Sequence, residues 1–284
     1  MGKKGKKAQA GKAKKLTPKE IGKRLDALVK KLEEELKGAD LFAPPPPMDD
    51  CPICLVPLSR GATTATSTFQ ACCGKIICFG CYKANEIIVE NQSEIAHTCP
   101  FCRAPETTGE QYFLQLETRA QKHPDACLAL GEAYIKGHYG NSKDELKALD
   151  CWIRAAELGD ATSCAAISRR YDTAESILPM NKKRSVLFAR LGALRGDLWG
   201  RYNIGIAEDE DGNHEIAIRH WKIAAECGNQ LSLDHLKDIF NTGGPGKEFI
   251  SKGDMDKIYR LCHEAQEEVR SEEREKYVAE SGTM

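Results

Sequence analysis

The chain has 284 residues, a formal net charge of −1 at pH 7 and 29% charged residues. This balance gives no chain-wide bias toward nucleic acid or membrane surfaces, and the length allows about two domains. No apolar run is long enough for a transmembrane helix, and no apolar stretch typical of a signal peptide follows the first lysines. We therefore expect a cytoplasmic or nuclear protein without a membrane partner, in which clustered cysteines are metal ligands rather than disulfides.

The first 50 residues are predicted to contain one helix between two segments that lack a core. Residues 1–16 form a lysine-rich tail with seven lysines, which we expect to be disordered because little in it could be buried. A solubilising role is the simplest interpretation, and nuclear import or polyanion binding is the alternative. Residues 39–50 form a proline-rich linker, in which Pro44–Pro47 should be an extended, stiff spacer.

An amphipathic helix is predicted over residues 17–38. Thr17 can cap the free amides, Pro18 suits the first turn, and Glu20 completes a capping box. One stripe of apolar side chains recurs at helical spacing: Ile21, Leu25, Leu28, Val29, Leu32 and Leu36. This stripe must lie against something. Either it packs on the chain's own later domains or it is a dimerising or partner-binding helix, and the sequence leaves both open.

Residues 51–103 contain eight of the 13 cysteines, arranged as close pairs. The pairs are Cys51 with Cys54, Cys72 with Cys73, Cys78 with Cys81, and Cys99 with Cys102. A Cys-x-x-Cys pair can hold one metal ion with both sulfurs, and eight thiolates are the number that two tetrahedral zinc ions need. The loop between Cys54 and Cys72 is too polar to fold unaided, which favours a module stabilised by metal.

The order of these pairs resembles that of the RING finger family. The resemblance implies an interleaved arrangement, with one zinc on Cys51, Cys54, Cys78 and Cys81 and the other on Cys72, Cys73, Cys99 and Cys102. Members usually carry a histidine in the second pair, but Lys75 occupies that place here. The resemblance therefore implies an all-cysteine module that Cys72 completes, with His97 as the alternative ligand.

The resemblance also implies that the module binds a ubiquitin-conjugating enzyme charged with ubiquitin. RING domains hold the thioester-linked ubiquitin in an attack-ready pose and supply no catalytic residue of their own. Ile53 matches an apolar contact on the first zinc loop, and Pro100 matches the second loop. Arg103 matches the residue that bridges the conjugating enzyme and ubiquitin, a role suited to the guanidinium fork.

One position departs from the family pattern. Many active members carry a large apolar residue one helical turn after the sixth ligand, and this chain has Asn85 there. Ile87 or Ile88 could contact the conjugating enzyme instead if the helix starts late, or both could face the module's own core. The departure leaves open which enzyme is bound and whether transfer occurs.

Residues 104–124 are predicted to be a linker, and the sequence then repeats itself over residues 125–240. Ala148-x-x-x-Trp152-x-x-Ala155-Ala156 recurs as Ala217-x-x-x-Trp221-x-x-Ala224-Ala225, with a weaker copy from Ser185. The markers Asp125, Asp160, Asp197 and Asn229 are 35, 37 and 32 residues apart. This period indicates helical hairpins whose small residues allow close approach, whose Trp fills the gap, and which stack into an α-solenoid.

The repeats resemble Sel1-like repeats, relatives of tetratricopeptide repeats, and such arrays are usually scaffolds that bind protein segments. Residues 241–284 are predicted to form a capping helix, over 253–278, and a tail. The expected fold class is thus mainly α, with a small two-zinc RING finger followed by an α-solenoid. We expect the zinc module and the repeats to fold independently, so that chelation would leave the repeat helices intact.

The sequence supports two functions. In the first, the chain is a ubiquitin-protein transferase of the RING type that holds a protein substrate or adaptor on its repeats. In the second, it is a zinc-stabilised interaction scaffold without ligase activity. We do not expect a nucleic-acid partner, because the only basic cluster is the lysine tail and the repeats lack a basic surface with interleaved aromatic residues.

Overall fold

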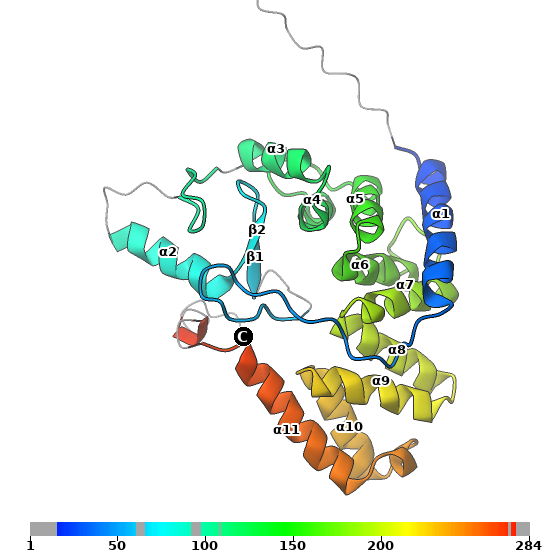
Figure 1. The fold of residues 1–284 in the computed structure, drawn as a ribbon. Coiled ribbons are helices and arrows are strands. Elements are labelled where there is room, and N and C mark those ends of the chain that lie inside the picture. The colour runs from blue at the N-terminus through cyan, green and yellow to red at the C-terminus, as the bar shows by residue number, and fades with distance from the viewer. Residues whose placement is uncertain (1–15, 61–65, 92–97, 108, 272–273, 277–284) are drawn as a thin grey trace, which may run out of the picture.

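The computed structural model describes residues 16–60, 66–91, 98–107, 109–271 and 274–276, and of residues 88–91 only the backbone. The chain is mainly helical, as the sequence predicts. Paired helices form a curved array, and a small cysteine-rich module lies on the open side of the curve between its two ends (Figure 1). Nearly all of the predicted tail, residues 1–15, lies outside the described residues.

Eight helices of the described chain pack in four pairs. The pairs are α4 (Pro124–Lys136) with α5 (Glu145–Glu157), α6 (Ala161–Asp172) with α7 (Lys182–Leu194), α8 (Leu198–Glu210) with α9 (His214–Glu226), and α10 (Gln230–Thr242) with α11 (Lys252–Glu268). A short 3-10 turn, η1 (Lys247–Phe249), joins the last two helices. Neighbouring pairs contact each other, which buries the apolar face that each would otherwise expose.

The last pair differs from the prediction. The sequence places the end of the repeats at residue 240 and a capping helix over 253–278. Helix α11 ends at Glu268, and it packs against both α9 and α10. Its buried side chains, Met255, Ile258 and Cys262, all lie in its first three turns. The charged residues after Glu267 bring no further apolar stripe to the array, and the helix ends there.

Glycine and tryptophan set the spacing within two of the pairs. Trp152 and Trp221 are only 1% and 0% exposed. A Cβ atom at Gly131 would lie 2.4 Å from Nε1 of Trp152, and one at Gly205 would lie 2.3 Å from Nε1 of Trp221. Each ring therefore occupies the space that the glycine leaves free, as the predicted pairing of small residues with Trp requires.

Three of the periodic marker residues are the N-caps of the first helix in their pair. The side chains of Asp160, Asp197 and Asn229 accept hydrogen bonds from backbone N–H groups in the first turns of α6, α8 and α10. Gly196, which precedes one of them, has a φ of +100°, a value that L side chains rarely adopt. The Gly-Asp signal thus ends one helix and starts the next.

Helix α1 (Pro18–Leu36) packs on the array's own helices α5 and α7. Its buried side chains are Ile21, Leu25, Leu28 and Leu32, and they join the same apolar core as the first two helix pairs. Ion pairs flank the stripe, with Arg24 beside Asp150 and Glu35 3.1 Å from Arg195. The sequence leaves open what covers the apolar stripe of α1. In the structure, the chain's own later domain covers it.

The predicted linker 104–124 contains a helix, α3 (Glu110–Arg119). Phe113 and Leu116, three residues apart, are buried against the first pair, and α3 packs on α4. Its N-cap, Gly109, makes no side-chain capping bond, so the usual sequence signal for a helix start is missing. The segment is therefore part of the array rather than a spacer.

The cysteine module is built on an antiparallel hairpin of β1 (Ser67–Gln70) and β2 (Lys75–Cys78), followed directly by α2 (Phe79–Asn91). Ala71, in the hairpin turn, is 2% exposed and belongs to the core of the first repeats, with Phe69 packed beside it. Tyr112 of α3 donates a hydrogen bond to the carbonyl of Phe69 at 3.3 Å. This shared core joins the module to the array.

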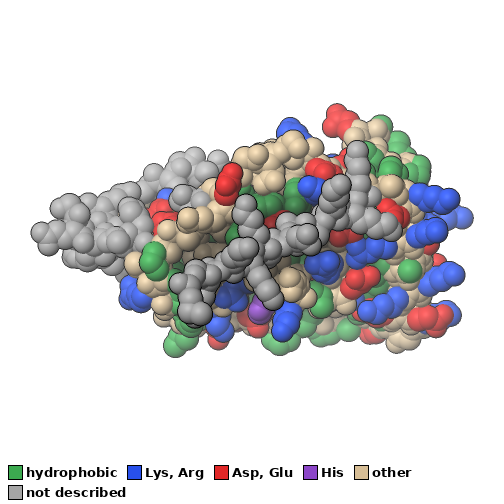
Figure 2. All heavy atoms as spheres, turned by 90° about the horizontal axis from the view of Figure 1, so that it is seen from above, with side chains coloured by type: hydrophobic (Ala, Val, Ile, Leu, Met, Phe, Trp, Pro, Cys, Tyr) green, Lys and Arg blue, Asp and Glu red, His purple; other side chains and the backbone are tan. Residues whose placement is uncertain are grey.

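Charges of both signs are mixed on the surface seen from above in Figure 2, most densely on the right, the side where α1 packs. Among the described residues, none of the helices combines the length and the apolar character needed to cross a bilayer.

We predict that Gly205→Ala lowers the free energy of unfolding by about 1–3 kcal/mol, because the new methyl group would overlap the Trp221 ring. Gly22→Ala is the matched control, since a Cβ there meets no atom within 4 Å. In a helix interior it should stabilise the protein by about 0.5–1 kcal/mol. Urea unfolding measures both variants, and equal midpoints would contradict the packing described.

Asp197 is 3% exposed, and its carboxylate accepts hydrogen bonds from the N–H groups of Trp199 and Gly200. Burial raises the pKa of Asp197 to about 6. Its stabilising contribution is therefore complete below about pH 4, the pKa of the unfolded chain, and is lost as the pH rises through about 6.

Asp197→Asn keeps a capping oxygen, as Asn229 does in the next pair, and removes the buried charge. Between pH 4 and pH 7 the wild type should lose about 1–3 kcal/mol of unfolding free energy relative to this variant. Asp197→Ala removes the cap itself and should cost about 1 kcal/mol even at pH 4. Denaturant titrations at pH 4 and pH 7 measure these free energies of unfolding. If the difference in unfolding free energy between the wild type and Asp197→Asn did not change with pH, a buried charge at Asp197 would be contradicted.

Candidate metal centre

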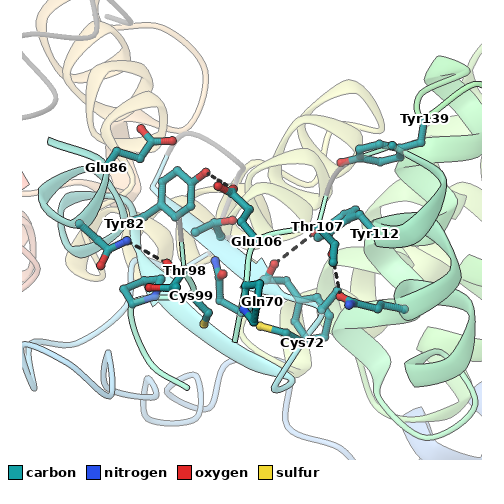
Figure 3. Close-up of a pocket in the computed structure, with 18 residues that line it drawn as sticks. Gln70, Cys72, Tyr82, Glu86, Thr98, Cys99, Glu106, Thr107, Tyr112 and Tyr139 are labelled. Carbon is teal, nitrogen blue, oxygen red and sulfur yellow. Dashed lines mark hydrogen bonds between the residues drawn. The ribbon is translucent and has the colours of Figure 1, made fainter. Parts of the chain in front are cut away.

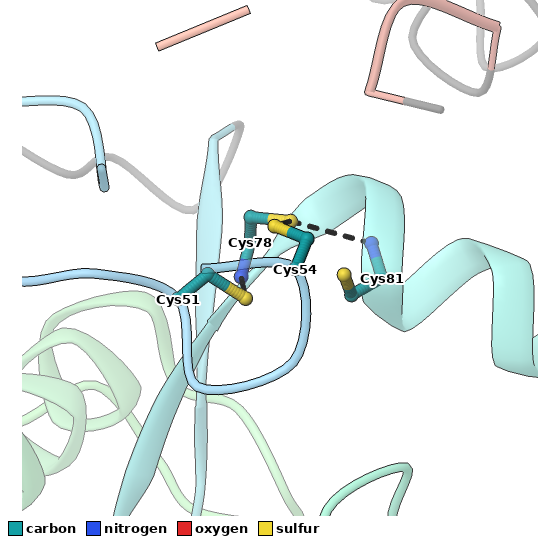
Figure 4. A group of neighbouring side chains, drawn as sticks. All are labelled: Cys51, Cys54, Cys78 and Cys81. Atoms are coloured by element: carbon teal, nitrogen blue, oxygen red, sulfur yellow. Dashed lines mark hydrogen bonds between the residues drawn. The ribbon is translucent and has the colours of Figure 1, made fainter. Parts of the chain in front are cut away.

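The first cysteine cluster joins the loop before the β-hairpin to the end of β2 and the start of α2. The sulfurs of Cys51, Cys54, Cys78 and Cys81 all lie within 4.8 Å of one another (Figure 4). Sγ of Cys54 is 3.8 Å from Sγ of Cys78. Two thiolates bound to one tetrahedral zinc ion, each about 2.3 Å from it, would be about 3.8 Å apart.

The second cluster joins the hairpin turn to the loop after α2. The sulfurs of Cys72, Cys73, Cys99 and Cys102 also lie within 4.8 Å of one another. Sγ of Cys73 is 3.9 Å from Cys99, and Sγ of Cys72 is 3.5 Å from Cys102. The structure thus brings together the same two interleaved sets that the RING resemblance implies, and each set could hold a metal ion.

Cys72 and Cys73 are adjacent in the turn between the two strands. The N–H groups of Cys73 and Gly74 both donate to the carbonyl of Gln70, at 3.2 and 2.7 Å. The turn brings both neighbouring thiols into the same cluster. Lys75 is exposed and starts β2. The alternative ligand, His97, lies outside the described residues.

The chemistry of the donor set fits a divalent cation. Burial raises the pKa of Cys51, but N–H groups of Cys78, Cys54 and Ile53 outweigh it and lower that pKa to about 7. Burial and the neighbouring thiols raise the pKa of Cys81 well above its usual range. Four thiolates at this distance repel one another, so the fully ionised set needs a positive charge among them.

Two knuckles of the same backbone geometry present the first and last cysteine pairs. The N–H of Cys51 donates to the carbonyl of Val56 at 3.0 Å, and the N–H of Cys99 donates to that of Ala104 at 2.8 Å. The residues that follow each pair, Leu55 and Arg103, have positive φ values of 59° and 62°. The repeated sequence Cys-Pro-x-Cys-x-x-Pro, in 51–57 and 99–105, is the signal of this duplication.

The residues predicted to bind a conjugating enzyme lie on these knuckles. Ile53 is 40% exposed and Arg103 is exposed, whereas Pro100 is half-buried. Sequence reasoning missed Leu55, which is 73% exposed at the position equivalent to Arg103, and Phe101, which is 41% exposed at the position equivalent to Ile53.

Asn85 has a structural role on α2. Its Nδ2 donates to the carbonyl of Thr98 at 3.0 Å, which ties α2 to the last knuckle. Ile87 is half-buried, and the side chain of Ile88 lies outside the described residues. This hydrogen bond gives the side chain of Asn85 a structural role at the position where the RING resemblance implies an apolar contact.

A cleft of about 280 Å³ separates the second cluster from the first repeat. Figure 3 shows Tyr82 and Glu86 on one side of it and Tyr112 and Tyr139 on the other. Tyr82 donates to Oε1 of Glu106 at 3.3 Å. Burial raises the pKa of Tyr82, and the carboxylates of Glu86 and Glu106 raise it further.

Two arginines that sequence reasoning missed hold the cysteine loops from outside the module. Arg119, at the end of α3, donates to the carbonyls of Ala71 and Cys72. Arg274 lies beyond α11 and holds the first knuckle. Its guanidinium donates to the carbonyls of Pro57 and Val56 at 2.7 and 2.9 Å and to Sγ of Cys54 at 3.6 Å. Backbone carbonyls leave no trace in a sequence, so neither contact could be predicted from side-chain patterns.

No protein-family model matches this chain, and no curated protein matches it. Among solved structures it is similar to a Sel1 repeat protein from Oxalobacter formigenes, with 25% identity, a TM-score of 0.48, and coverage of 55% of this chain and 64% of that one.

A second similar structure is a protective antigen present in uropathogenic Escherichia coli strains, described as displaying an SLR fold. It has 18% identity, a TM-score of 0.44, and coverage of 69% of this chain and 47% of that one. A third, the immunity protein Pa5087 from Pseudomonas aeruginosa, has 14% identity, a TM-score of 0.34, and coverage of 71% and 88%. The chain therefore spans less than two thirds of the first two proteins, and Sel1-repeat proteins are among its structural neighbours.

The contacts of Arg274 generate a metal prediction. In protein loaded with zinc, Arg274→Ala should release one metal ion to a chromophoric chelator about 10-fold faster than the wild type does, because residues around metal ligands typically contribute 10–100-fold to affinity. Arg270→Ala is the control, since Arg270 lies nearby, is exposed and pairs only with Glu267 and Glu275 among the described residues. A metal content other than two ions, or equal release from both variants and wild type, would contradict this assignment.

Proposed function

We propose that this protein is a RING-type ubiquitin ligase whose cysteine module binds two zinc ions and a charged ubiquitin-conjugating enzyme. The observation that carries the proposal is the pair of interleaved four-cysteine clusters, with Ile53 and Arg103 exposed on the two matching knuckles. Zinc, when bound, would cross-link each cluster and fix the knuckles relative to α2. The rest of the proposed activity is positioning, which needs no acid or base from this chain.

The proposed docking edge combines apolar and donor groups. Ile53 and Phe101 offer exposed apolar surface on equivalent knuckle positions. Arg103 is held at a positive φ by the N–H bond from its backbone to the carbonyl of Cys99 at 3.0 Å. Its guanidinium is then free of any ion pair among the described residues, and it could bond the conjugating enzyme and ubiquitin at once.

The helical array is proposed to hold a protein substrate or adaptor. Its inner side contains a cavity of about 500 Å³, lined by residues of α6, α8, α10 and α11 and by Met48, Ser59 and Arg60. Trp199, in that lining, is 48% exposed. An exposed tryptophan at a concave surface is the kind of anchor that protein interfaces use.

A zinc-stabilised scaffold without ligase activity is the second candidate. The hydrogen bond of Asn85 to Thr98 favours it, because that position carries no apolar side chain for a conjugating enzyme. Under this alternative the protein binds two zinc ions and stable protein partners but no conjugating enzyme.

Self-ubiquitination with a panel of conjugating enzymes separates the two candidates. We expect transfer with at least one enzyme, and an approximately 10-fold or greater loss in Arg103→Asn, because asparagine tolerates the left-handed backbone but lacks the guanidinium. Leu114→Ala is the control, since Leu114 is 62% exposed on α3 and outside the module. No transfer and no binding of any conjugating enzyme would leave the scaffold. Wild-type activity in Arg103→Asn would contradict the bridging role proposed for Arg103.

A further inference from the structure

The linker between α1 and the cysteine module makes a specific contact with the array. Residues 40–43 form a turn in which the N–H of Phe42 donates to Oδ1 of Asp40 at 2.9 Å and the N–H of Ala43 donates to the carbonyl of Asp40 at 3.1 Å. The turn presents Leu41 and Phe42 to helices α8 and α9. A plain spacer would not need such contacts.

The aromatic ring of Phe42 contacts two side chains of α9. The guanidinium of Arg219 is 3.6 Å from the ring centroid, a cation–π distance, and the His220 ring is 4.9 Å away at an angle of 34°. Such a cation–π contact is attractive, and more so where water is excluded from it. Arg219 is exposed, so its place over the ring is not forced by packing from other helices.

The backbone just before Phe42 meets a buried arginine. Arg201 of α8 is 1% exposed, and its Nη1 donates to the carbonyl of Leu41 at 2.6 Å. Its Nη2 donates to the carbonyl of Ala193, its Nε has no partner, and no carboxylate pairs with it in the described part of the chain. Since a buried guanidinium without an ion pair is costly, the peptide carbonyl from the linker is an important acceptor.

These side chains define a small recognition surface, which we call the α8–α9 site: Arg201, Arg219 and His220. Arg219 and His220 contact an aromatic ring, and Arg201 donates a hydrogen bond to the carbonyl of the residue before that ring. The site also places positive charge near Asp40. The neighbouring Nδ1 of His220 is buried and also without a partner among the described atoms. The surface is complementary to an acidic residue followed two positions later by an aromatic one.

We propose that the α8–α9 site is a peptide-docking site for acidic–apolar–aromatic turns, filled in this chain by Asp40, Leu41 and Phe42. A partner protein that carries such a turn binds by displacing the linker. Displacement would free residues 39–45 from the array, whereas Pro46 and Asp49 stay bonded to Arg60 and Leu58 of the module. The freed segment is the link between α1 and the module, so partner binding would be coupled to the position of the module. The inference adds a ligand chemistry to the proposed protein-binding role of the array and is independent of ubiquitin transfer.

A peptide of residues 37–45, labelled with a fluorophore, provides the test in trans. It should bind the full-length Phe42→Ala protein saturably and the wild type at least 10-fold more weakly, because the tethered segment competes at a high effective concentration. The same peptide with Phe42→Ala should not bind. Absence of saturable binding to a Phe42→Ala protein with native helicity, or equal binding of both peptides, would overturn the proposal.

Receptor variants locate the contact. Adding Arg219→Ala to the Phe42→Ala protein should weaken peptide binding at least 10-fold, whereas adding Arg260→Ala should not, because Arg260 is an exposed arginine that pairs with Glu264 on α11. Equal effects of the two substitutions would place the peptide elsewhere and overturn the site.

Hydrogen exchange gives a second readout that does not require Phe42→Ala to fold. In the otherwise wild-type protein, Arg219→Ala should speed exchange at the amides of Phe42 and Ala43 several-fold relative to Arg260→Ala. Saturating peptide should do the same in the wild type. Unchanged exchange in both experiments would overturn the docking site, while leaving the result of the ubiquitination assay unaffected.

Discussion

Two guanidinium groups hold the cysteine module to opposite ends of the helical array. Arg119 binds the carbonyls of the hairpin turn from the start of the array, and Arg274 binds those of the first knuckle from its end. Charged donors make stronger hydrogen bonds than neutral ones, and each group spans two carbonyls at once. The module therefore closes the open side of a curved stack, and the cavity on the inner side of the stack is bounded by both parts of the chain.

The features that follow from local chemistry could be predicted from the sequence. Gly131 and Gly205 occur where Trp152 and Trp221 need space, and Asp160 and Asp197 follow glycines because a carboxylate there caps the next helix. The pairing of the cysteines into two clusters follows from their spacing together with the family resemblance. In each case a side chain of a particular type is required, so the requirement is visible in the sequence.

The features that depend on backbone acceptors or on distant surfaces could not be predicted. Helix α3 lacks a capping side chain, and its packing partners lie in other elements. Arg119, Arg201 and Arg274 bind carbonyl groups, which every residue has, so their partners carry no signature. The packing partner of α1 could not be predicted either. An amphipathic stripe shows that one face of a helix is buried, but it does not show which surface covers that face.

Closure of the array limits how the protein can change in evolution. Open stacks of helical hairpins tolerate insertion or deletion of whole repeats, because each unit contacts only its neighbours. Here an added or lost hairpin would move the position that carries Arg274 away from the first knuckle by the width of one unit. Both arginines can bind the module at the same time only when the array has its present number of hairpins. Homologues that keep both arginines are thus expected to keep the number of hairpins, and those that vary in length are expected to have lost one of the two contacts.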